Sequence, residues 1–374
     1  MAEWTSSNYI PYGFLDDIQR AVAEEFTVLS SYIELGTPTF IISTTETKKP
    51  FKRLATKMKS RGHLPILRKE NEQLILRIIP KPVTKPARVG INLILFLVTL
   101  VTVSISAFFL CTDPIYSNEL APGVNIYLET ILVTASVFAI IGLHEFGHFL
   151  SCKLRGLEAT LPYFIPGIPL LSPLGTFGAV IIQREPTTNR DEMFDLGSSG
   201  PIFGFLVSVI VTIIGLQRGF SFTVSETQLE YFAQKYPQIS FTYITPPIIM
   251  SFLTSILHPY PEGFTLYIGP VAFTAYIGLL ITFINLLPTW QLDGGWVSLS
   301  VLGEKWQKVL SWISVLILFF LGYWFMAMLV LFGMWRSRAV LPLDNVSSLS
   351  SSRKLLSIAL LSILILSATF TPYA

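Results

Sequence analysis

The 374-residue chain is 51% hydrophobic and only 13% charged, with a mean hydropathy of +0.59. A soluble protein carries roughly 25% charged residues, so this composition excludes an ordinary soluble protein and predicts an integral membrane protein. The formal net charge of +2 gives no sign of a nucleic-acid partner. The two cysteines, Cys111 and Cys152, fall at opposite ends of apolar segments, and we expect no disulfide.

Residues 1–85 are expected to form a small α+β module outside the membrane. An amphipathic helix at about 18–26 is followed by two strands, a basic helix and two further strands, at about 26–34, 38–43, 51–61, 66–68 and 73–79. The stretch shows no catalytic constellation, which favours a docking or regulatory role. The Pro-rich connector at 79–86 can continue neither a strand nor a helix, and it leads into a membrane domain over 86–374.

Six apolar segments are predicted to span the membrane as helices. They cover about 89–110, 127–154, 194–216, 267–287, 310–333 and 355–370. Lys81, Lys85 and Arg88 precede the first span, whereas the loop after it has no Lys or Arg. The positive-inside rule therefore predicts a multi-pass protein of the cell membrane with a cytoplasmic N-terminus.

The last part of this topology contains a conflict. Alternation of six spans puts the loop after the fifth span on the outer side. That loop carries four basic residues, namely Arg336, Arg338, Arg353 and Lys354. We keep six spans because the charge rule is weaker for late helices than for the first one.

One stretch carries the clearest chemistry, the H-E-x-x-H pentapeptide from His144 to His148. On a helix, residues four apart share a face, so His144 and His148 can bind one metal ion. Glu145 lies beside the pair and can take a proton from water activated by that metal. A structural His pair or a chance match is the alternative, but three ionisable groups inside an apolar run favour a functional site. Its position near the inner end of the second span places the site on the cytoplasmic side.

The segment 162–183 is apolar but broken by several Pro and Gly residues, so it cannot be an ordinary spanning helix. Residues 176–182 read best as a strand. Irregular backbone at membrane depth is tolerated only against protein or a water-filled cavity. We therefore expect a membrane-associated β-hairpin beside the active site, whose free edge could pair with an unwound substrate. A plain amphipathic loop in the cytoplasm is the alternative.

Small residues open the third span, at Gly197, Gly200 and Gly204. They allow helices to approach closely, which is the commoner reason for such a pattern and the one that we favour. They could also leave room beside the metal.

The second informative stretch runs from Asn285 through Pro288 to Asp293-Gly294-Gly295. A buried Asp and Asn next to a helix-breaking Pro require a functional explanation. Asp293 can supply a third zinc ligand, which gives two His and one carboxylate with a fourth position open for water. The fourth span ends on the inner side, so its end meets the inner end of the second span.

Together, His144-Glu145-x-x-His148 and Asn285-x-x-Pro288 with Asp293-Gly294-Gly295 resemble the site-2 protease family of intramembrane zinc metalloproteases, peptidase family M50. The stretch 197–201 resembles the third-span motif of that family. Residues 32–40, 174–181 and 189–191 resemble its archaeal, cyanobacterial and plastid-type branch. One departure is Trp296, where relatives often carry a His that is not a ligand.

The resemblance implies a polytopic α-helical membrane protein that acts as a zinc metalloendopeptidase. One Zn²⁺ would be held by His144, His148 and Asp293, with Glu145 as catalytic base. Asn285 would steady the oxyanion or hold the unwound substrate, a role that the family suggests. The expected partners are a transmembrane protein substrate and the lipid bilayer. The alternative function is a metal-ion transporter or metal-binding membrane scaffold without hydrolytic activity. An inactive family member is a third possibility, which the complete ligand set disfavours.

Overall fold

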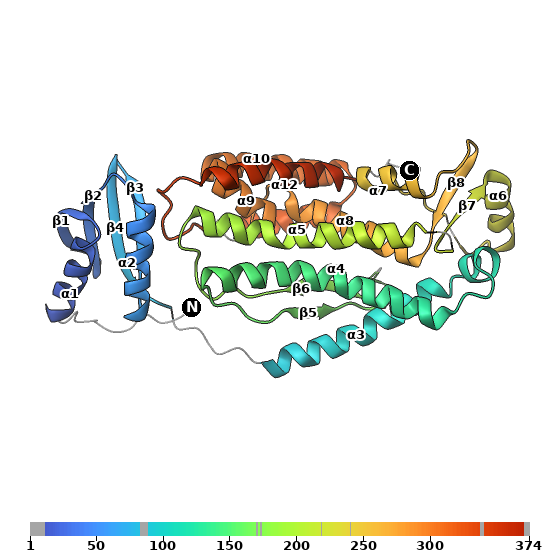
Figure 1. The fold of residues 1–374 in the computed structure, drawn as a ribbon, viewed down its shortest axis with the longest axis horizontal. Helices are drawn as coiled ribbons and strands as arrows, with labels where there is room; N and C mark the ends of the chain where they lie inside the picture. Colours follow the sequence, from blue (N-terminus) through green and yellow to red (C-terminus); the bar gives the residue numbers. More distant parts are fainter. Residues whose placement is uncertain are drawn as a thin grey trace. The chain divides into compact units, whose positions relative to one another are not determined.

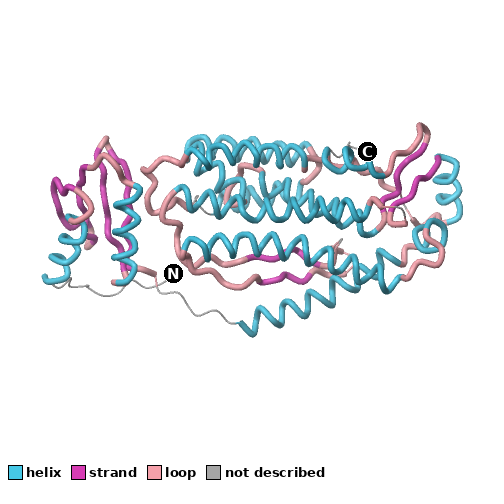
Figure 2. The backbone as a smooth tube through the Cα atoms, in the orientation of Figure 1, coloured by secondary structure: helices cyan, strands magenta, loops and turns pink. Residues whose placement is uncertain are grey.

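The computed structural model describes residues 12–82, 89–169, 171–172, 174–217, 219–239, 241–336 and 340–369, without the side chains of residues 12–14. Figures 1 and 2 show the course of the chain. It forms two compact units. The first consists of Met1–Pro86, Glu185–Met193 and Val340–Ser351, and the second of Ala87–Arg184, Phe194–Ala339 and Ser352–Ala374. A single boundary after residue 85 therefore does not describe the first unit, because two later segments join it.

The first unit is built on a four-stranded antiparallel sheet with two helices. Its elements are α1 (Tyr12–Ala23), β1 (Thr27–Glu34), β2 (Thr37–Ser43), α2 (Lys48–Ser60), β3 (His63–Glu70) and β4 (Gln73–Pro80), and the strand order is β1-β2-β4-β3. The elements follow one another in the predicted order. Buried apolar side chains from both helices, such as Val22, Leu54 and Met58, pack on Phe40 and Leu76 of the sheet. Burial of this apolar surface is the main force that holds the unit together.

The two later segments extend the open edge of this sheet beyond β3. The Leu67 amide donates a hydrogen bond to the Leu343 carbonyl (2.9 Å), and the Leu343 amide donates to the Thr187 carbonyl (2.9 Å). Short parallel bridges link Asp344 to Leu67 and to Asn189. Leu343 is also part of the apolar core of the unit. Residues 340–351 and 185–193 therefore lie on the same side of any membrane as the N-terminal module.

The second unit consists mainly of apolar helices. Three of its described helices are long and apolar enough to cross a membrane, namely α3 (Val89–Cys111), α4 (Ile126–Arg155) and α5 (Arg190–Gly215). They coincide with the first three predicted spans. The predicted spans at 267–287 and 355–370 correspond to the shorter helices α8 (Pro270–Leu286) and α12 (Ser351–Leu366). The observed helix begins three residues later than the predicted span 267–287, because Tyr267 and Ile268 belong to a strand and Pro270 starts the helix.

The predicted fifth span at 310–333 is wrong, because the structure has two helices there. α9 (Asp293–Leu302) leads into α10 (Glu304–Phe320), and α11 (Trp324–Arg336) follows after a short turn. Gly322 in that turn has φ +82°, a left-handed conformation that glycine adopts without strain. Ser311 in the middle of α10 and Gly333 near the end of α11 both lie against Trp290. The two helices are also in contact with each other across a turn of three residues, so they are antiparallel.

This hairpin removes the conflict in the predicted topology. A pair of antiparallel helices returns the chain to the side on which it began. The loop that follows it, residues 340–351, belongs to the same compact unit as the N-terminal module. The predicted outer position of this loop is therefore wrong. Arg353 and Lys354 directly follow the loop, and the loop lies on the same side as the N-terminal module and its basic residues.

The segment between α4 and α5 forms the expected hairpin rather than a plain loop. β5 (Tyr163–Pro166) and β6 (Thr176–Val180) pair in antiparallel fashion. The hairpin is fixed to α3, since Asn92 donates hydrogen bonds to the carbonyls of Leu161 (2.8 Å) and Pro162 (3.0 Å), and Thr102 donates to that of Gly175 (2.8 Å). On the other side, β6 contacts α4. The hairpin is thereby placed beside the helix that carries the H-E-x-x-H motif.

The remaining described elements of the second unit join the ends of these helices. They are the π-helix η1 (Ile115–Leu120), the strand pair β7 (Ser221–Ser225) and β8 (Phe264–Ile268), and the helices α6 (Glu226–Lys235) and α7 (Ile248–Leu257). η1 lies between the first and second predicted spans, and the other four elements follow the third, with β8 reaching two residues into the predicted fourth span.

Glu185 has an unusual position in the first unit. Its side chain is almost fully buried, and its two oxygens meet the Lys59 and Lys81 ammonium groups at 2.6 and 2.5 Å. Burial alone would raise the pKa of Glu185, but the hydrogen bonds of the two lysines outweigh it, and the pKa is lowered from its ordinary value of 4.5. The ionised form is thus favoured by folding.

We expect Glu185→Gln to destabilise the first unit by about 2 kcal/mol at pH 7, the typical contribution of hydrogen bonds to a charged group. Because the folded pKa lies below the unfolded value, the contribution of Glu185 is complete above about pH 4.5 and is lost as the pH falls through the folded pKa. The difference between wild type and variant should therefore shrink in acid.

The measurement is urea unfolding of the full chain in detergent, followed by pulse proteolysis at pH 7 and with pepsin at pH 3. Glu72→Gln is the control, because its ion pair with Lys69 is exposed and should contribute little. An equal effect of Glu185→Gln at both pH values would contradict the prediction.

Candidate metal centre and active site

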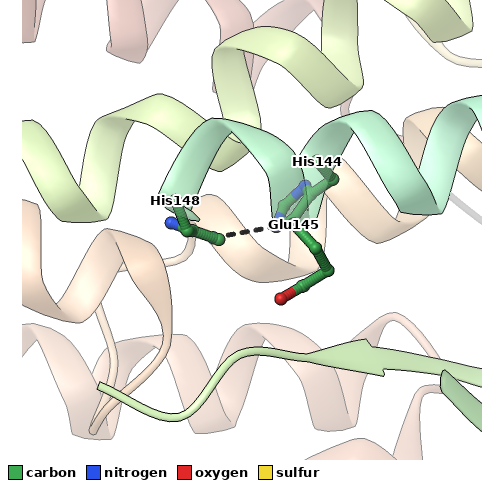
Figure 3. Close-up of side chains that lie close together, drawn as sticks. All are labelled: His144, Glu145 and His148. Atoms are coloured by element: carbon green, nitrogen blue, oxygen red, sulfur yellow. Dashed lines mark hydrogen bonds between the residues drawn. The ribbon is translucent and has the colours of Figure 1, made fainter. Parts of the chain in front are cut away.

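One turn of α4 presents the three ionisable residues of the motif. His144, Glu145 and His148 are all buried, with 5–8% of their surface exposed. Figure 3 shows the three side chains leaving the same turn of the helix. The two imidazoles converge, and their Nε2 atoms lie 3.2 Å apart. Two nitrogens with free lone pairs at this distance repel one another unless a proton or a metal ion lies between them.

Asp293, the first residue of α9, brings its carboxylate to the same point. Its Oδ2 lies 3.2 Å from Nε2 of His144, and its Oδ1 lies 3.3 Å from Nε2 of His148. The tight turn between α8 and α9 makes this approach possible. The structure therefore brings together the three residues that the sequence suggested as ligands.

The donor set fits a small tetrahedral ion. Zn²⁺ binds imidazole nitrogen and carboxylate oxygen at about 2.0–2.1 Å, so two ligand atoms of a tetrahedral site are about 3.3–3.4 Å apart. The Nε2 atoms of His144 and His148 lie 3.2 Å apart, and each lies 3.2–3.3 Å from a different oxygen of the Asp293 carboxylate, distances close to this requirement. Two neutral imidazoles and one carboxylate leave a fourth position for water, as in catalytic zinc sites.

Two backbone groups orient the side chains of the motif. His148 donates a hydrogen bond from Nδ1 to the Leu196 carbonyl at the start of the membrane part of α5 (2.8 Å). This bond fixes the tautomer and leaves the Nε2 lone pair for a metal. The Glu145 carboxylate accepts a hydrogen bond from the Ile181 amide, directly after β6 (2.9 Å). Both partners lie in the chain segment between α4 and the body of α5.

Asn285 also lies at this site. Its Nδ2 is 3.4 Å from Nε2 of His144, and its side chain lines a cavity of about 360 Å³ with His144 and Glu145. The remaining walls are mainly apolar or backbone and come from α4, β6, α8 and α11: Ile140, Ile141, Thr176–Ala179, Ile277, Ile281 and Met326. Such a cavity can hold an extended stretch of apolar peptide next to the metal ligands.

The glycines of α5 have a larger role at the site than the sequence analysis gave them. Close packing is present, because a Cβ on Gly147 would lie 2.7 Å from the Ser199 carbonyl oxygen. A Cβ on Gly200, however, would collide with Nε2 of His148, the ligand atom itself, and one on Gly204 would lie 2.9 Å from Nδ1 of His144. Gly200 and Gly204 thus leave room for the imidazoles of His148 and His144.

Sequence reasoning missed Asp195 completely. This carboxylate pairs with Arg155 at the end of α4 and with Arg353 at the start of α12, in the latter case at 2.7 Å. It directly precedes Leu196, whose carbonyl holds His148. Asp195 therefore ties three helix ends together next to the metal ligands. A carboxylate at the start of an apolar run was the available signal.

The model of peptidase family M50 matches residues 132–329, more than half of the chain. The chain is similar to the protein named probable zinc metalloprotease EGY2, chloroplastic, of Arabidopsis thaliana, with 28% identity over 51% of this chain and 32% of the relative. It is also similar to probable zinc metalloprotease EGY1, chloroplastic, of the same plant, with 29% identity over 42% of this chain and 27% of the relative.

The matches cover about a third of these curated relatives. No solved structure matches the chain. The matched region includes α4 with the H-E-x-x-H motif and α9 with Asp293, which are the elements that form the centre described above. The resemblance of the sequence to this family is therefore confirmed, and the chain belongs to peptidase family M50.

Proposed function

We propose that the protein is an intramembrane zinc metalloendopeptidase that cuts peptide bonds within or near transmembrane segments of other membrane proteins. The observation that carries this proposal is the convergence of His144, His148 and Asp293 with Glu145 beside them, inside an apolar helical unit. The family match and the names of the relatives support the same activity.

In the proposed mechanism, a zinc ion held by the two histidines and Asp293 would activate a water molecule and polarise the scissile carbonyl. Glu145 accepts the proton of that water and later passes it to the leaving amine nitrogen. The Leu196 carbonyl keeps His148 in the tautomer that binds metal. For Asn285 we propose contact with the oxyanion or with the unwound substrate, a role supported by its position in the cavity.

The free edge of β6 is the proposed substrate-binding strand. Residues 176–179 line the cavity that contains His144 and Glu145, and the other edge of β6 is occupied by β5. The Ile181 amide points to Glu145 and away from β5, so alternate backbone groups of β6 face the site. A transmembrane segment that unwinds can pair with this edge and place one of its carbonyl groups next to the metal ligands.

We further propose a multi-pass protein of the cell membrane whose N-terminal module and active-site side face the cytoplasm. The basic residues Lys153 and Arg353 lie at the end of α4 and at the start of α12, and Lys81 precedes the first span in the sequence, which supports the orientation. The two relatives described above are named as chloroplastic, and a membrane of a plastid is the other location to test. The module at 1–85 is proposed to serve in docking or regulation, and 86–374 to form the protease domain.

A metal-ion transporter or metal-binding scaffold would also place ligands in the membrane. Neither of these functions gives Glu145 a chemical role, however. Neither accounts for a strand edge that lines the cavity beside the candidate metal ligands. The family match also favours a peptidase.

We expect Glu145→Gln to lower kcat by about 10²–10⁴-fold, because the amide cannot accept the proton of the attacking water. Zinc content should stay at that of the wild type, since Glu145 is not one of the three converging ligands. The measurement is cleavage of a membrane-segment reporter in liposomes, combined with metal analysis of the same samples. Equal cleavage by wild type and variant would refute the role of Glu145, and absence of cleavage by both with zinc retained would favour the scaffold.

We expect Gly200→Ala to lower zinc content severely, because the added methyl group would occupy the space of the His148 ligand atom. Gly142→Ala on α4 is the matched control, since its methyl group would meet the Phe164 ring at an ordinary 3.9 Å. The measurement is bound zinc per chain after equilibration with a chelator of known affinity. Full zinc retention in Gly200→Ala would contradict the placement of the centre against α5.

A further inference from the structure

We propose that Gln307 and Ser311 of α10 are positioning residues for the metal centre, because they hold the turn that carries Asp293. The inference rests on the proposed function and adds a task for the helix that follows α9. Neither side chain belongs to the ligand set, and neither is among the described residues that line the cavity beside it.

The three candidate ligands are not held in the same way. His144 and His148 belong to the interior of the long helix α4, whose own backbone hydrogen bonds fix their spacing. Asp293 is the first residue of α9 and follows the turn 287–292, which lies outside the helices and strands. Its two oxygens nevertheless reach the Nε2 atoms of both histidines, at 3.2 and 3.3 Å. The position of this ligand therefore depends on what holds the turn.

The backbone of the turn is strained at Trp290, which adopts φ +43°. A bulky residue in this left-handed region is unfavourable by itself, and the strain persists only where surrounding contacts maintain it. The Trp290 ring packs against α11, where a Cβ on Gly333 would lie 2.5 Å from a ring atom. The neighbouring helices therefore impose this conformation on the turn.

Gln307 and Ser311 hold the backbone on both sides of Trp290 by hydrogen bonds. The Gln307 side-chain amide donates to the Trp290 carbonyl (3.1 Å), and the Trp290 amide donates to the Ser311 hydroxyl (3.1 Å). The Ser311 hydroxyl also accepts a hydrogen bond from the Gln307 side chain (3.3 Å) and donates one to the Gln307 carbonyl (2.8 Å). Both side chains belong to residues that are only 2% exposed. Water cannot replace these partners inside an apolar unit, so the bonds are costly to lose.

The turn is in direct contact with the start of α9. A Cβ on Gly295 would collide with the Trp290 carbonyl oxygen, which is the atom that Gln307 binds. Gly295 lies two residues after Asp293, in the same helical turn. α9 and α10 also contact one another (Figure 1). A shift of the Trp290 carbonyl would therefore move the backbone of Asp293 and change the direction of its carboxylate.

The test uses the full chain with Gln307→Met, which keeps the length of the side chain but cannot donate a hydrogen bond, and with Ser311→Ala. Ser314→Ala is the matched control. Ser314 lies on the same face of α10, three residues after Ser311, and is 1% exposed. Its hydroxyl has no hydrogen-bond partner among the residues that the structure describes, so its removal should cost little.

Three quantities are measured for each variant: the dissociation constant of Zn²⁺ by competition with a chelator, the visible absorption of the Co²⁺-substituted protein in detergent, and kcat and KM for the membrane reporter in liposomes. We expect Gln307→Met and Ser311→Ala to raise the dissociation constant about 10–100-fold, the usual effect of removing a group that supports a metal ligand. The Co²⁺ absorption, which reports the geometry of the ligands, should change in both. At saturating zinc, kcat should fall while KM stays close to the wild-type value, because neither side chain is among those that line the cavity.

Zinc affinity and Co²⁺ absorption equal to those of the wild type in both variants would overturn the proposal. An equal loss of affinity in Ser314→Ala would also overturn it, because it would assign the effect to the general packing of α10. Ser311→Ala, the smaller change, decides the question if Gln307→Met does not fold. If the wild type binds zinc but shows no peptidase activity, the proposed function fails. Zinc affinity and Co²⁺ absorption still decide the positioning role in that case, since neither depends on turnover.

Discussion

The structure depends on one constraint, the cost of placing ionisable groups inside an apolar helical unit. Two histidines and two carboxylates, Glu145 and Asp293, are gathered there with little access to solvent. Each would be unfavourable alone, because its charge or hydrogen-bonding groups lose water on burial. Together they can share one metal ion, and every neighbouring element is arranged to allow it. α5 approaches α4 closely because it has glycines at the contact. The turn before α9 brings the Asp293 carboxylate to the same place.

The convergence of His144, His148 and Asp293 could be predicted from the sequence because it is encoded locally. Two histidines four residues apart need only a helix to converge, and an Asp after a helix-breaking Pro needs only the end of a neighbouring span. The orienting groups could not be predicted in this way. They are the backbone amide of Ile181 and the backbone carbonyl of Leu196. Nearly every residue has these groups, so the sequence does not indicate which of them act at the site. Gly200 was visible, but glycine in a membrane helix has a more common explanation, so its meaning required the position of His148.

The fold was predictable where hydropathy and helix length agree, as in α3, α4 and α5. It was not predictable at 310–333, because an apolar run looks the same whether it crosses a membrane once or folds into α10 and α11. The turn at Gly322 consists of three residues with apolar neighbours on both sides. The break between α10 and α11 and the position of residues 340–351 in the first unit show which of the two is correct, and the second of these depends on contacts between segments far apart in the sequence.

The inclusion of residues 340–351 in the first unit has a consequence for the order in which the protein matures. A chain is synthesised from its N-terminus, and N-terminal domains usually complete their fold first. This module cannot do so, because Leu343 completes its core and the strand beside β3 only after nearly the whole chain has been made. A nascent chain would therefore contain α4 and α9 before the core of the first unit is complete. The fold of the first unit is completed by a segment that follows most of the second unit in the sequence.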